Sequence, residues 1–250
     1  MLAKRIIPTL LCRGRQLVKG SKFDSWRSVG VAEQAVRIHQ ARGVDELVLL
    51  DITATAENRG PDLELVAKLA ESCFMPLTVG GGVKTVEDVR ALLHAGADKV
   101  LVGTAAYKDP YALFKMAEAV GSQAIVVAVD VRGKSVYIES GKTRTRTPPL
   151  RFADMVSWCG AGEILLTSIE REGTMEGYDL ELVRQVAEKV DIPVIANGGC
   201  GTYEHMKAAL EAGASGVAAG AMFQFTDATP GEAAQYLHEH GIEVRLKEET

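Results

Sequence analysis

The stretch PLTVGGGVKT at Pro76–Thr85 occurs again, further along the chain, as PVIANGGCGT at Pro193–Thr202. The likeness extends to both sides of this stretch at one constant offset. DLELV at Asp62–Val66 returns unchanged at Asp179–Val183, and AGADKVLVGTA at Ala95–Ala105 returns as AGASGVAAGAM. Segments of this length that align without an insertion indicate the duplication of a supersecondary unit.

Each copy alternates short apolar runs with helical patterns, which is typical of βα units on a parallel sheet. Eight such runs follow one another: Arg5–Leu11, Leu47–Leu50, Leu77–Val79, Val100–Val102, Ala124–Val129, Ile164–Thr167, Pro193–Ala196 and Val217–Ala219. In a chain of 250 residues they predict a single (β/α)8 TIM-barrel domain, 1–250, built from half-barrels at about 1–119 and 120–250. A doubly wound open sheet is the alternative, but it does not call for matching glycine loops in both halves.

The composition excludes several classes of function. A net charge of −5 gives no overall basic footprint for nucleic acid, although Arg13, Arg15, Lys19 and Lys22 form a local basic run. No stretch approaches the roughly 18 apolar residues of a membrane span, and the start MLAKRIIP lacks the apolar region of a signal peptide. We therefore expect a cytoplasmic protein without nucleic-acid or membrane partners.

The cysteines and histidines do not form a metal-binding pattern. Cys12, Cys73, Cys159 and Cys200 are far apart and lack CxxC spacing, which favours reduced packing thiols over a zinc site. The five histidines fall in expected helices or near the C-terminus rather than at strand ends. We expect neither a metal nor a cofactor.

Two segments are too long for ordinary βα connections. Cys12–Gly30 is basic and punctuated by glycine, and it looks like a mobile lid that precedes a helix at Val31–Ala41. Val131–Pro149 alternates polar and apolar residues, which predicts a small hairpin, with its last two prolines opening the next helix. Gly231–His240 is the eighth expected helix, and KEET at 247–250 is expected to fray.

Glycine-bearing strand ends occur in symmetric pairs. Gly80-Gly81-Gly82 corresponds to Asn197-Gly198-Gly199, and Gly103-Thr104 corresponds to Gly220-Ala221. Glycine lets backbone N–H groups approach an anion closely, and a following helix N-terminus favours negative charge. The pairs predict two phosphate sites, at Gly81, Gly82, Gly103 and Thr104 and at Gly198, Gly199, Gly220 and Ala221, the second being the usual location in barrel enzymes. The alternative is that these glycines only form tight turns.

Two aspartates end strands beside these loops. Asp51 follows the second apolar run and Asp130 follows the fifth. Burial disfavours a carboxylate and raises its pKa toward a role in proton transfer. Under the pseudo-twofold symmetry, the position that corresponds to Asp130 is Leu11.

Several stretches taken together resemble the HisF family, the cyclase subunits of imidazole glycerol phosphate synthase. They are LAKRIIP, VKG, DELVLLDITA, TVGGG, GADKV, GSQA, GAGEILLTSI and HGIEVRL, and they cover nearly the whole chain. The resemblance implies a duplicated half-barrel, a small-molecule substrate with two phosphates and a HisH-type glutaminase that supplies ammonia.

The family's general acid–base pair falls on positions 11 and 130, so that Asp130 is kept as the catalytic residue while Leu11 replaces the other aspartate. Other departures are Gly103, Ala221, Glu170 and Glu172. Positions that still fit the family's substrate-binding pattern are Lys19, Asp51, Thr104, Thr167, Ser168 and Gly199.

Arg5, Glu46, Lys99 and Glu163 match the family's charged gate for ammonia at the opposite end of the barrel. Without the family, these charges at strand starts indicate an ionic plug that supports stability. A working gate is the interpretation we favour, because the residues at the other end have changed while these have not.

TLLCRGRQLVKGSKF, ESCFMP and GGGVKT most resemble HisF paralogues associated with amidation of surface-polysaccharide sugars. In that setting a HisF-like chain and a HisH-like glutaminase supply ammonia to a separate sugar amidotransferase. The resemblance therefore implies an ammonia-conducting barrel. A true cyclase and a non-catalytic scaffold that activates its glutaminase are the alternatives.

Overall fold

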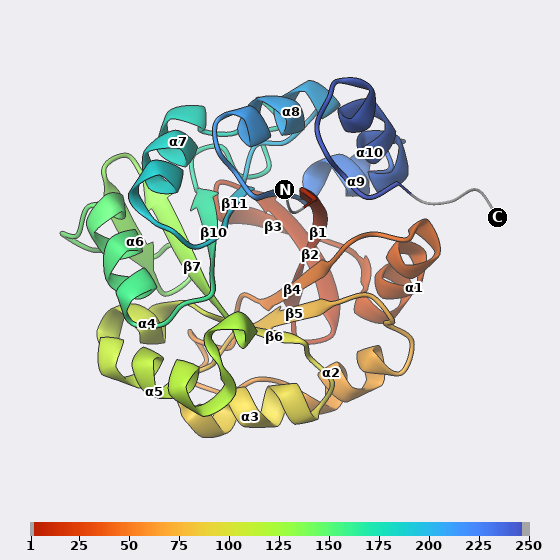
Figure 1. Cartoon of the computed structure of the whole chain (residues 1–250). Helices are drawn as coiled ribbons and strands as arrows, with labels where there is room; N and C mark the ends of the chain where they lie inside the picture. Colours follow the sequence, from red (N-terminus) through yellow and green to blue (C-terminus); the bar gives the residue numbers. More distant parts are fainter. Residues whose placement is uncertain (1–2, 247–250) are drawn as a thin grey trace.

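The computed structural model describes residues 3–246, and its centre is a closed barrel of parallel strands inside a ring of helices (Figure 1). The strands pair in the order β1-β4-β5-β6-β7-β10-β11-β12, and β12 pairs back with β1. The predicted TIM-barrel fold is thus confirmed. A doubly wound open sheet is excluded because the ring of strands closes.

Each of the eight predicted apolar runs is a barrel strand, with ends that differ by a few residues from those expected. The strands are β1 (Arg5–Arg13), β4 (Leu47–Asp51), β5 (Leu77–Gly80), β6 (Lys99–Val102), β7 (Ile125–Arg132), β10 (Glu163–Ser168), β11 (Val194–Asn197) and β12 (Gly216–Ala219).

Helices cover the outside of the barrel. The longer ones are α1 (Ala32–Arg42), α2 (Leu63–Ala70), α3 (Val86–His94), α5 (Pro110–Val120), α6 (Pro149–Trp158), α7 (Leu180–Lys189), α8 (Tyr203–Glu211) and α10 (Pro230–Glu239). Short helices are α4 (Thr104–Lys108), α9 (Ala221–Phe225) and the 3₁₀ turn η1 (Ser122–Ala124). No helix in this part of the chain has the length and apolar character needed to cross a membrane.

The repeated DLELV motif begins a helix in both halves, for the same reason. Asp62 accepts a hydrogen bond from Leu65 N at 3.0 Å at the start of α2, and Asp179 accepts one from Leu182 N at 3.1 Å at the start of α7. A side-chain acceptor at this position satisfies an N–H that has no partner within the helix.

Alternation along the strands separates two hydrophobic cores, because successive side chains point to opposite faces. The larger core lies between the strands and the helices. The smaller core fills the inside of the barrel and consists of Ile7, Val48, Leu101, Val126, Leu165, Ile195 and Ala218.

The strand register places Leu11 and Asp130 at corresponding positions. Leu11 on β1 pairs with Leu50 on β4, and Asp130 on β7 pairs with Thr167 on β10. Leu50 and Thr167 are related by the offset of the sequence repeat. The structure thus supports the equivalence that the sequence pattern suggested.

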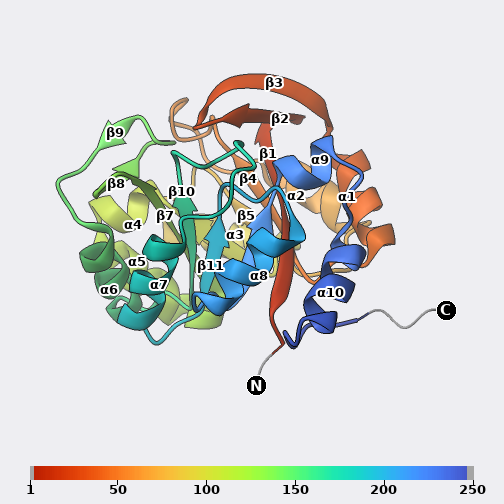
Figure 2. The same ribbon diagram turned by 90° about the horizontal axis from the view of Figure 1, so that it is seen from above.

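The segment expected as a lid is an antiparallel hairpin, β2 (Gln16–Ser21) and β3 (Asp24–Val31), which continues from the end of β1. It lies across one end of the barrel (Figure 2). Its strands were not predicted, because polar residues and glycines obscure the alternation. As a result α1 begins one residue later than expected.

The second insertion is the expected hairpin. β7 runs past the barrel and pairs with β8 (Ser135–Ile138), which pairs with β9 (Thr143–Arg144). Pro149 is the first residue of α6, as predicted. The expected frayed end, 247–250, lies outside the described residues.

Candidate functional site

A cavity of about 640 Å³ opens at the carboxyl ends of the barrel strands. Its lining includes most of the predicted site residues: Lys19, Asp51, Gly81, Gly82, Gly103, Thr104, Asp130, Thr167 and Gly220. Ser168, Gly198, Gly199 and Ala221 are not among the lining residues. The sequence therefore identified one side of the cavity more completely than the other.

Asp130 is the titratable group of the cavity with the largest resolved shift. Burial raises its pKa to about 7; a hydrogen bond from Thr167 opposes this rise, and the nearby charge of Glu172 adds to it. Thr167 also accepts a hydrogen bond from the Asn197 amide at 3.1 Å, so its hydroxyl proton points away from Asn197 and is available for Asp130. A carboxyl group with this pKa can exchange a proton near neutral pH.

Leu11 faces the same cavity and cannot exchange a proton. A leucine side chain offers neither an acid nor a base, so the two strand ends that correspond under the pseudo-twofold symmetry differ in chemistry. Of these two equivalent positions, only the one on β7 therefore carries a carboxyl group.

A buried ion pair joins the hairpin to the loop after β10. Lys19 on β2 pairs with Glu172, and each residue is at most 5% exposed. The backbone supports this contact, since Lys22 N donates to Glu172 O at 2.8 Å. The arrangement holds the hairpin over the cavity.

Asp51 is held mainly by its own neighbourhood. Arg59 Nη2 lies 2.6 Å from Asp51 Oδ2, and the backbone N–H groups of Thr53 and Ala54 donate to Asp51 Oδ1 at 3.0 and 3.2 Å. These contacts satisfy most of the acceptor capacity of the carboxylate. Asp51 therefore shapes the wall of the cavity.

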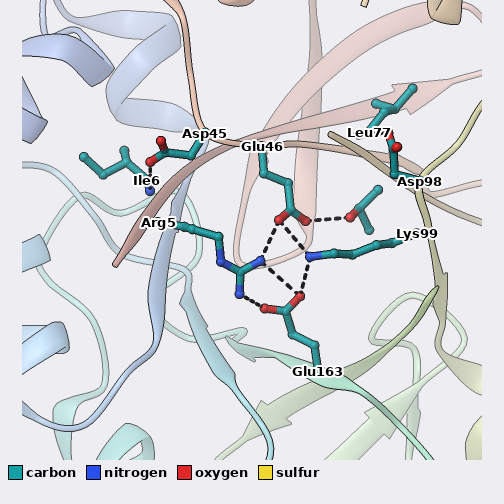
Figure 3. A network of polar contacts seen from close by, with 9 residues as sticks. Arg5, Ile6, Asp45, Glu46, Leu77, Asp98, Lys99 and Glu163 are labelled. Carbon is teal, nitrogen blue, oxygen red and sulfur yellow. Dashed lines mark hydrogen bonds and ion pairs between the residues drawn. The ribbon is translucent and has the colours of Figure 1, made fainter. Parts of the chain in front are cut away.

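The opposite end of the barrel is closed by a ring of four charged side chains (Figure 3). Arg5 Nη1 lies 2.6 Å from Glu46 Oε2, and Arg5 also pairs with Glu163. Lys99 Nζ lies 2.9 Å from a carboxylate oxygen of each glutamate. Thr78 donates to the remaining oxygen of Glu46 at 2.7 Å.

The two glutamates of the ring are more deeply buried than the two cations. Their side chains are 4% and 7% exposed, compared with 27% for Arg5 and 21% for Lys99. Burial alone would raise the pKa of Glu46, but Lys99, Arg5 and Thr78 outweigh it and hold the pKa below its usual value. The two negative and two positive charges of the ring thus balance, and each charged group has a partner within the ring.

Comparisons with known proteins agree with this architecture. A family model described as "Histidine biosynthesis protein" matches residues 5–229. A curated relative, the imidazole glycerol phosphate synthase subunit HisF of Natranaerobius thermophilus, is 46% identical over 251 residues, which cover 98% of this chain and 100% of the relative. The chain belongs to the HisF family.

In this HisF-family chain, the glycines of the first predicted phosphate site lie directly on the cavity. Gly82 has φ +75°, and a Cβ there would lie 2.6 Å from the carbonyl oxygen of Arg59, so only glycine fits the turn. Thr104 accepts a hydrogen bond from Glu139 N at 2.9 Å, which leaves its hydroxyl proton available to the cavity. Since α4 has only five residues, side chains and local N–H groups must supply most of any attraction for an anion.

Gly198 and Gly199, from the second predicted phosphate site, lie under other loops. A Cβ on Gly198 would lie 2.8 Å from Ser168 O, and a Cβ on Gly199 would collide with Gly177 O, whose residue donates its own N–H to Gly199 O at 2.7 Å. Close backbone packing is therefore one reason for both glycines.

Sequence reasoning missed several residues that line the cavity. Phe23 and Trp26 come from the first hairpin, and Ile138, Glu139 and Ser140 come from the second. Lys84 was also missed, although its position directly after the GGGV turn was a usable signal. The hairpin residues gave no such signal, because their approach to the cavity depends on contacts between distant loops.

The thiols fit a structural role. Cys12 and Cys200 are buried, Cys73 and Cys159 are half-buried, and all four are free. Burial raises the pKa of Cys12 and of Cys200 to about 12, which disfavours the reactive thiolate. Between residues 3 and 246 there is no cluster of three or more His, Cys, Asp or Glu residues suited to a metal ion.

Proposed function

We propose that this HisF-family chain conducts ammonia from a HisH-type glutaminase through the barrel to the cavity at its other end. The ammonia would serve amidation of a sugar for a surface polysaccharide, carried out by a separate amidotransferase. The observation that carries the proposal is the combination of a complete charged ring at one end with Leu11 in the cavity at the other. The free thiols favour a reducing compartment such as the cytoplasm.

The inside of the barrel suits a neutral passenger. Beyond the charged ring lies the inner apolar core, and two of its members, Leu101 and Leu165, form part of the cavity lining. Such a layer offers an ammonium ion no solvation, whereas uncharged ammonia loses much less on entering it. Ammonia must also be uncharged to act as a nucleophile, so a dry route serves the chemistry at its end.

The glutaminase would dock around the strand starts, near the ring and Asp98. At rest, the ring excludes water by filling the entrance with paired charges. The cations are its more exposed members, so a docking partner can draw them aside while the glutamates stay buried. Lys99 is the best single probe, because its one ammonium group bridges both glutamates.

Lys99→Ala tests the proposal in the complex with the glutaminase and the acceptor enzyme. We expect the fold to persist, since Arg5 still pairs with both glutamates. Ammonia should leak, so that free ammonia per glutamine hydrolysed rises well above the wild-type value. Lys189→Ala, which changes an exposed pair with Asp154, is the matched control.

Full coupling in Lys99→Ala would contradict a gate at Lys99. If no glutaminase binds the wild-type chain, the conduit itself is refuted. A scaffold that only activates the glutaminase would raise glutamine hydrolysis without any dependence of ammonia transfer on Lys99.

A true cyclase is the second candidate, and the pKa of about 7 at Asp130 favours it. The curated relative also carries the name of the synthase subunit. The test supplies the purified chain with the ribosyl-formimino bisphosphate substrate and ammonium at alkaline pH. With Leu11 in place of one acid–base group, we expect turnover about 10²–10⁴-fold below that of an authentic cyclase. Comparable turnover would overturn our choice.

A further inference from the structure

We propose that the cavity recognises a sugar monophosphate, with its single phosphate at Lys84 and Thr104 and its hydroxyl groups at Glu172. This inference rests on the proposed function, because it concerns the cavity to which the ammonia would be delivered. It follows from an asymmetry between the two halves of the barrel.

Lys84 supplies a positive charge that makes no ion pair within the described part of the chain. Its Nζ donates to the Asn58 side-chain oxygen at 2.6 Å, and no ion pair of Lys84 is found among residues 3–246. The other lysine on this side, Lys108, lies 2.5 Å from a Glu139 oxygen and is compensated. All four of these residues line the cavity.

The same wall carries neutral donors. Thr104 presents a hydroxyl, and the Asn58 amide nitrogen is free of any hydrogen bond found within the described chain. Gly81 and Gly82 bring the backbone to the surface of the cavity beside them. A free cation with neutral donors is an arrangement that suits one phosphate group.

The second half lacks these cations. At the sequence offset of the repeat, Lys84 corresponds to Gly201 and Lys108 corresponds to Phe225. Neither can attract an anion by charge. The duplication therefore preserved the glycine turns in both halves, but the lysines occur in only one.

A compensated ion pair lies against the second glycine loops. A Cβ on Gly198 would lie 3.5 Å from the backbone of Glu172, and one on Gly220 would lie 3.4 Å from Lys19 Nζ, so the Lys19–Glu172 pair covers the second glycine loops. Glu172 compensates the charge of Lys19 and so removes its attraction for a phosphate. A second phosphate would also have to approach a carboxylate.

Glu172 has one unused oxygen. Oε1 pairs with Lys19, whereas Oε2 is buried and has no hydrogen-bond partner within residues 3–246. The residue is 4% exposed and lines the cavity. A buried acceptor without a partner favours a ligand that brings an O–H donor.

Leucines make part of the cavity lining apolar. Leu11, Leu50, Leu101 and Leu165 all line the cavity. A ring of carbon atoms can lie against this apolar surface, with a phosphate at one end and hydroxyls at the other. The volume of about 640 Å³ is in the usual range for a small-molecule site.

Calorimetric titration of the full chain with glucose 6-phosphate, glucose 1,6-bisphosphate and inorganic phosphate tests the inference. We expect the monophosphate to bind at least about tenfold more tightly than inorganic phosphate, since the sugar carries hydroxyl donors for Glu172 in addition to its phosphate. The second phosphate of the bisphosphate should not increase the affinity. A bisphosphate that binds tenfold more tightly than the monophosphate, or equal affinities for the monophosphate and inorganic phosphate, would overturn the proposal.

Two substitutions assign the ends of the site. Lys84→Ala should weaken both glucose 6-phosphate and inorganic phosphate by about tenfold, while Lys189→Ala, at another exposed lysine, should change neither. Glu172→Gln should weaken only the sugar phosphate, toward the affinity of inorganic phosphate. Unchanged affinities in Lys84→Ala would refute the phosphate end, and unchanged sugar selectivity in Glu172→Gln would refute the hydroxyl end.

Thermal unfolding checks that each variant is folded. If Glu172→Gln does not fold, Lys84→Ala and the comparison of ligands still decide the outcome, because Lys84 is exposed. All these affinities are measured on the barrel alone. They can therefore fail while ammonia transfer succeeds, and the reverse also holds.

Discussion

At the carboxyl end of β7, Asp130 lies in the protein wall beside Glu172 and Thr167, and this environment raises its pKa to about 7. The residue at the corresponding register on β1 is Leu11. The two equivalent strand ends thus carry different residues at this register. Asp130 can exchange a proton near neutral pH and Leu11 cannot, although both residues line the cavity.

Asp130→Asn should change the pH dependence of stability. A carboxyl group whose pKa rises on folding costs stability as pH increases from about 4 to about 7, because the unfolded chain ionises more easily. The asparagine variant removes this cost. We expect its free energy of unfolding to exceed that of the wild type by about 1–3 kcal/mol at pH 8, and to differ little from it near pH 4.

Denaturant titrations at both pH values give these free energies. Asp191→Asn, at an exposed aspartate, is the control and should show no such divergence. A difference between Asp130→Asn and wild type that is constant from pH 4 to pH 8 would show that Asp130 ionises as easily in the folded chain as in the unfolded one.

Two hairpins, β2–β3 and β8–β9, shape the mouth of the barrel. The β2–β3 hairpin contacts the loop after β10 at Gly173, where a Cβ would collide with the backbone of Gly20. Its tip carries Phe23, whose ring lies against Gly141 of the β8–β9 turn. Small residues at both contacts let the hairpins approach the cavity closely.

Gly173→Ala should loosen the β2–β3 hairpin and leave the barrel folded. The added methyl group has no room against Gly20, and φ +74° is itself unfavourable for alanine. We expect a local cost of about 1–2 kcal/mol and roughly tenfold faster trypsin cleavage within the hairpin.

Gly133→Ala is the matched control for the hairpin experiment. Gly133 also has a positive φ, +56°, but a Cβ there would meet nothing within 4 Å. Backbone strain is therefore common to both variants, and only the collision differs. Equal cleavage rates in the two variants would contradict close docking of the hairpin at Gly173.

Closure of the barrel governs the whole molecule. β6 pairs with β7 and β12 pairs with β1, so the two expected half-barrels are joined along both of their seams. The inner core draws side chains from both halves. Neither half keeps a complete core or a closed sheet without the other. The boundary near residue 120 remains a prediction from the repeat.

Hydrogen exchange should therefore report one cooperative opening for both halves. Peptides that contain β4 and β5 are expected to match peptides that contain β10 and β11 in their slowest exchange, within about 1 kcal/mol of opening free energy. Mass spectrometry after timed labelling measures this. Protection that differs by several kcal/mol between the two sets would show that the halves open independently.

Local sequence features are enough to predict the barrel and to name many of the residues at its two ends. Apolar runs and glycine turns are local features, and their repetition was enough to identify eight strands. The charged residues of the ring could be named, but their mutual contacts could not.

Which loops meet over the cavity can be seen only in the tertiary structure. Lys19 and Glu172 lie far apart in the chain and form one buried pair, while Lys84 has no ion pair with a carboxylate among the residues that the structure describes. Local periodicity encodes whether a residue points into or out of its own strand, but it does not encode which distant side chain compensates its charge. That depends on the closure of the barrel, which brings the strand ends and their loops to a common mouth.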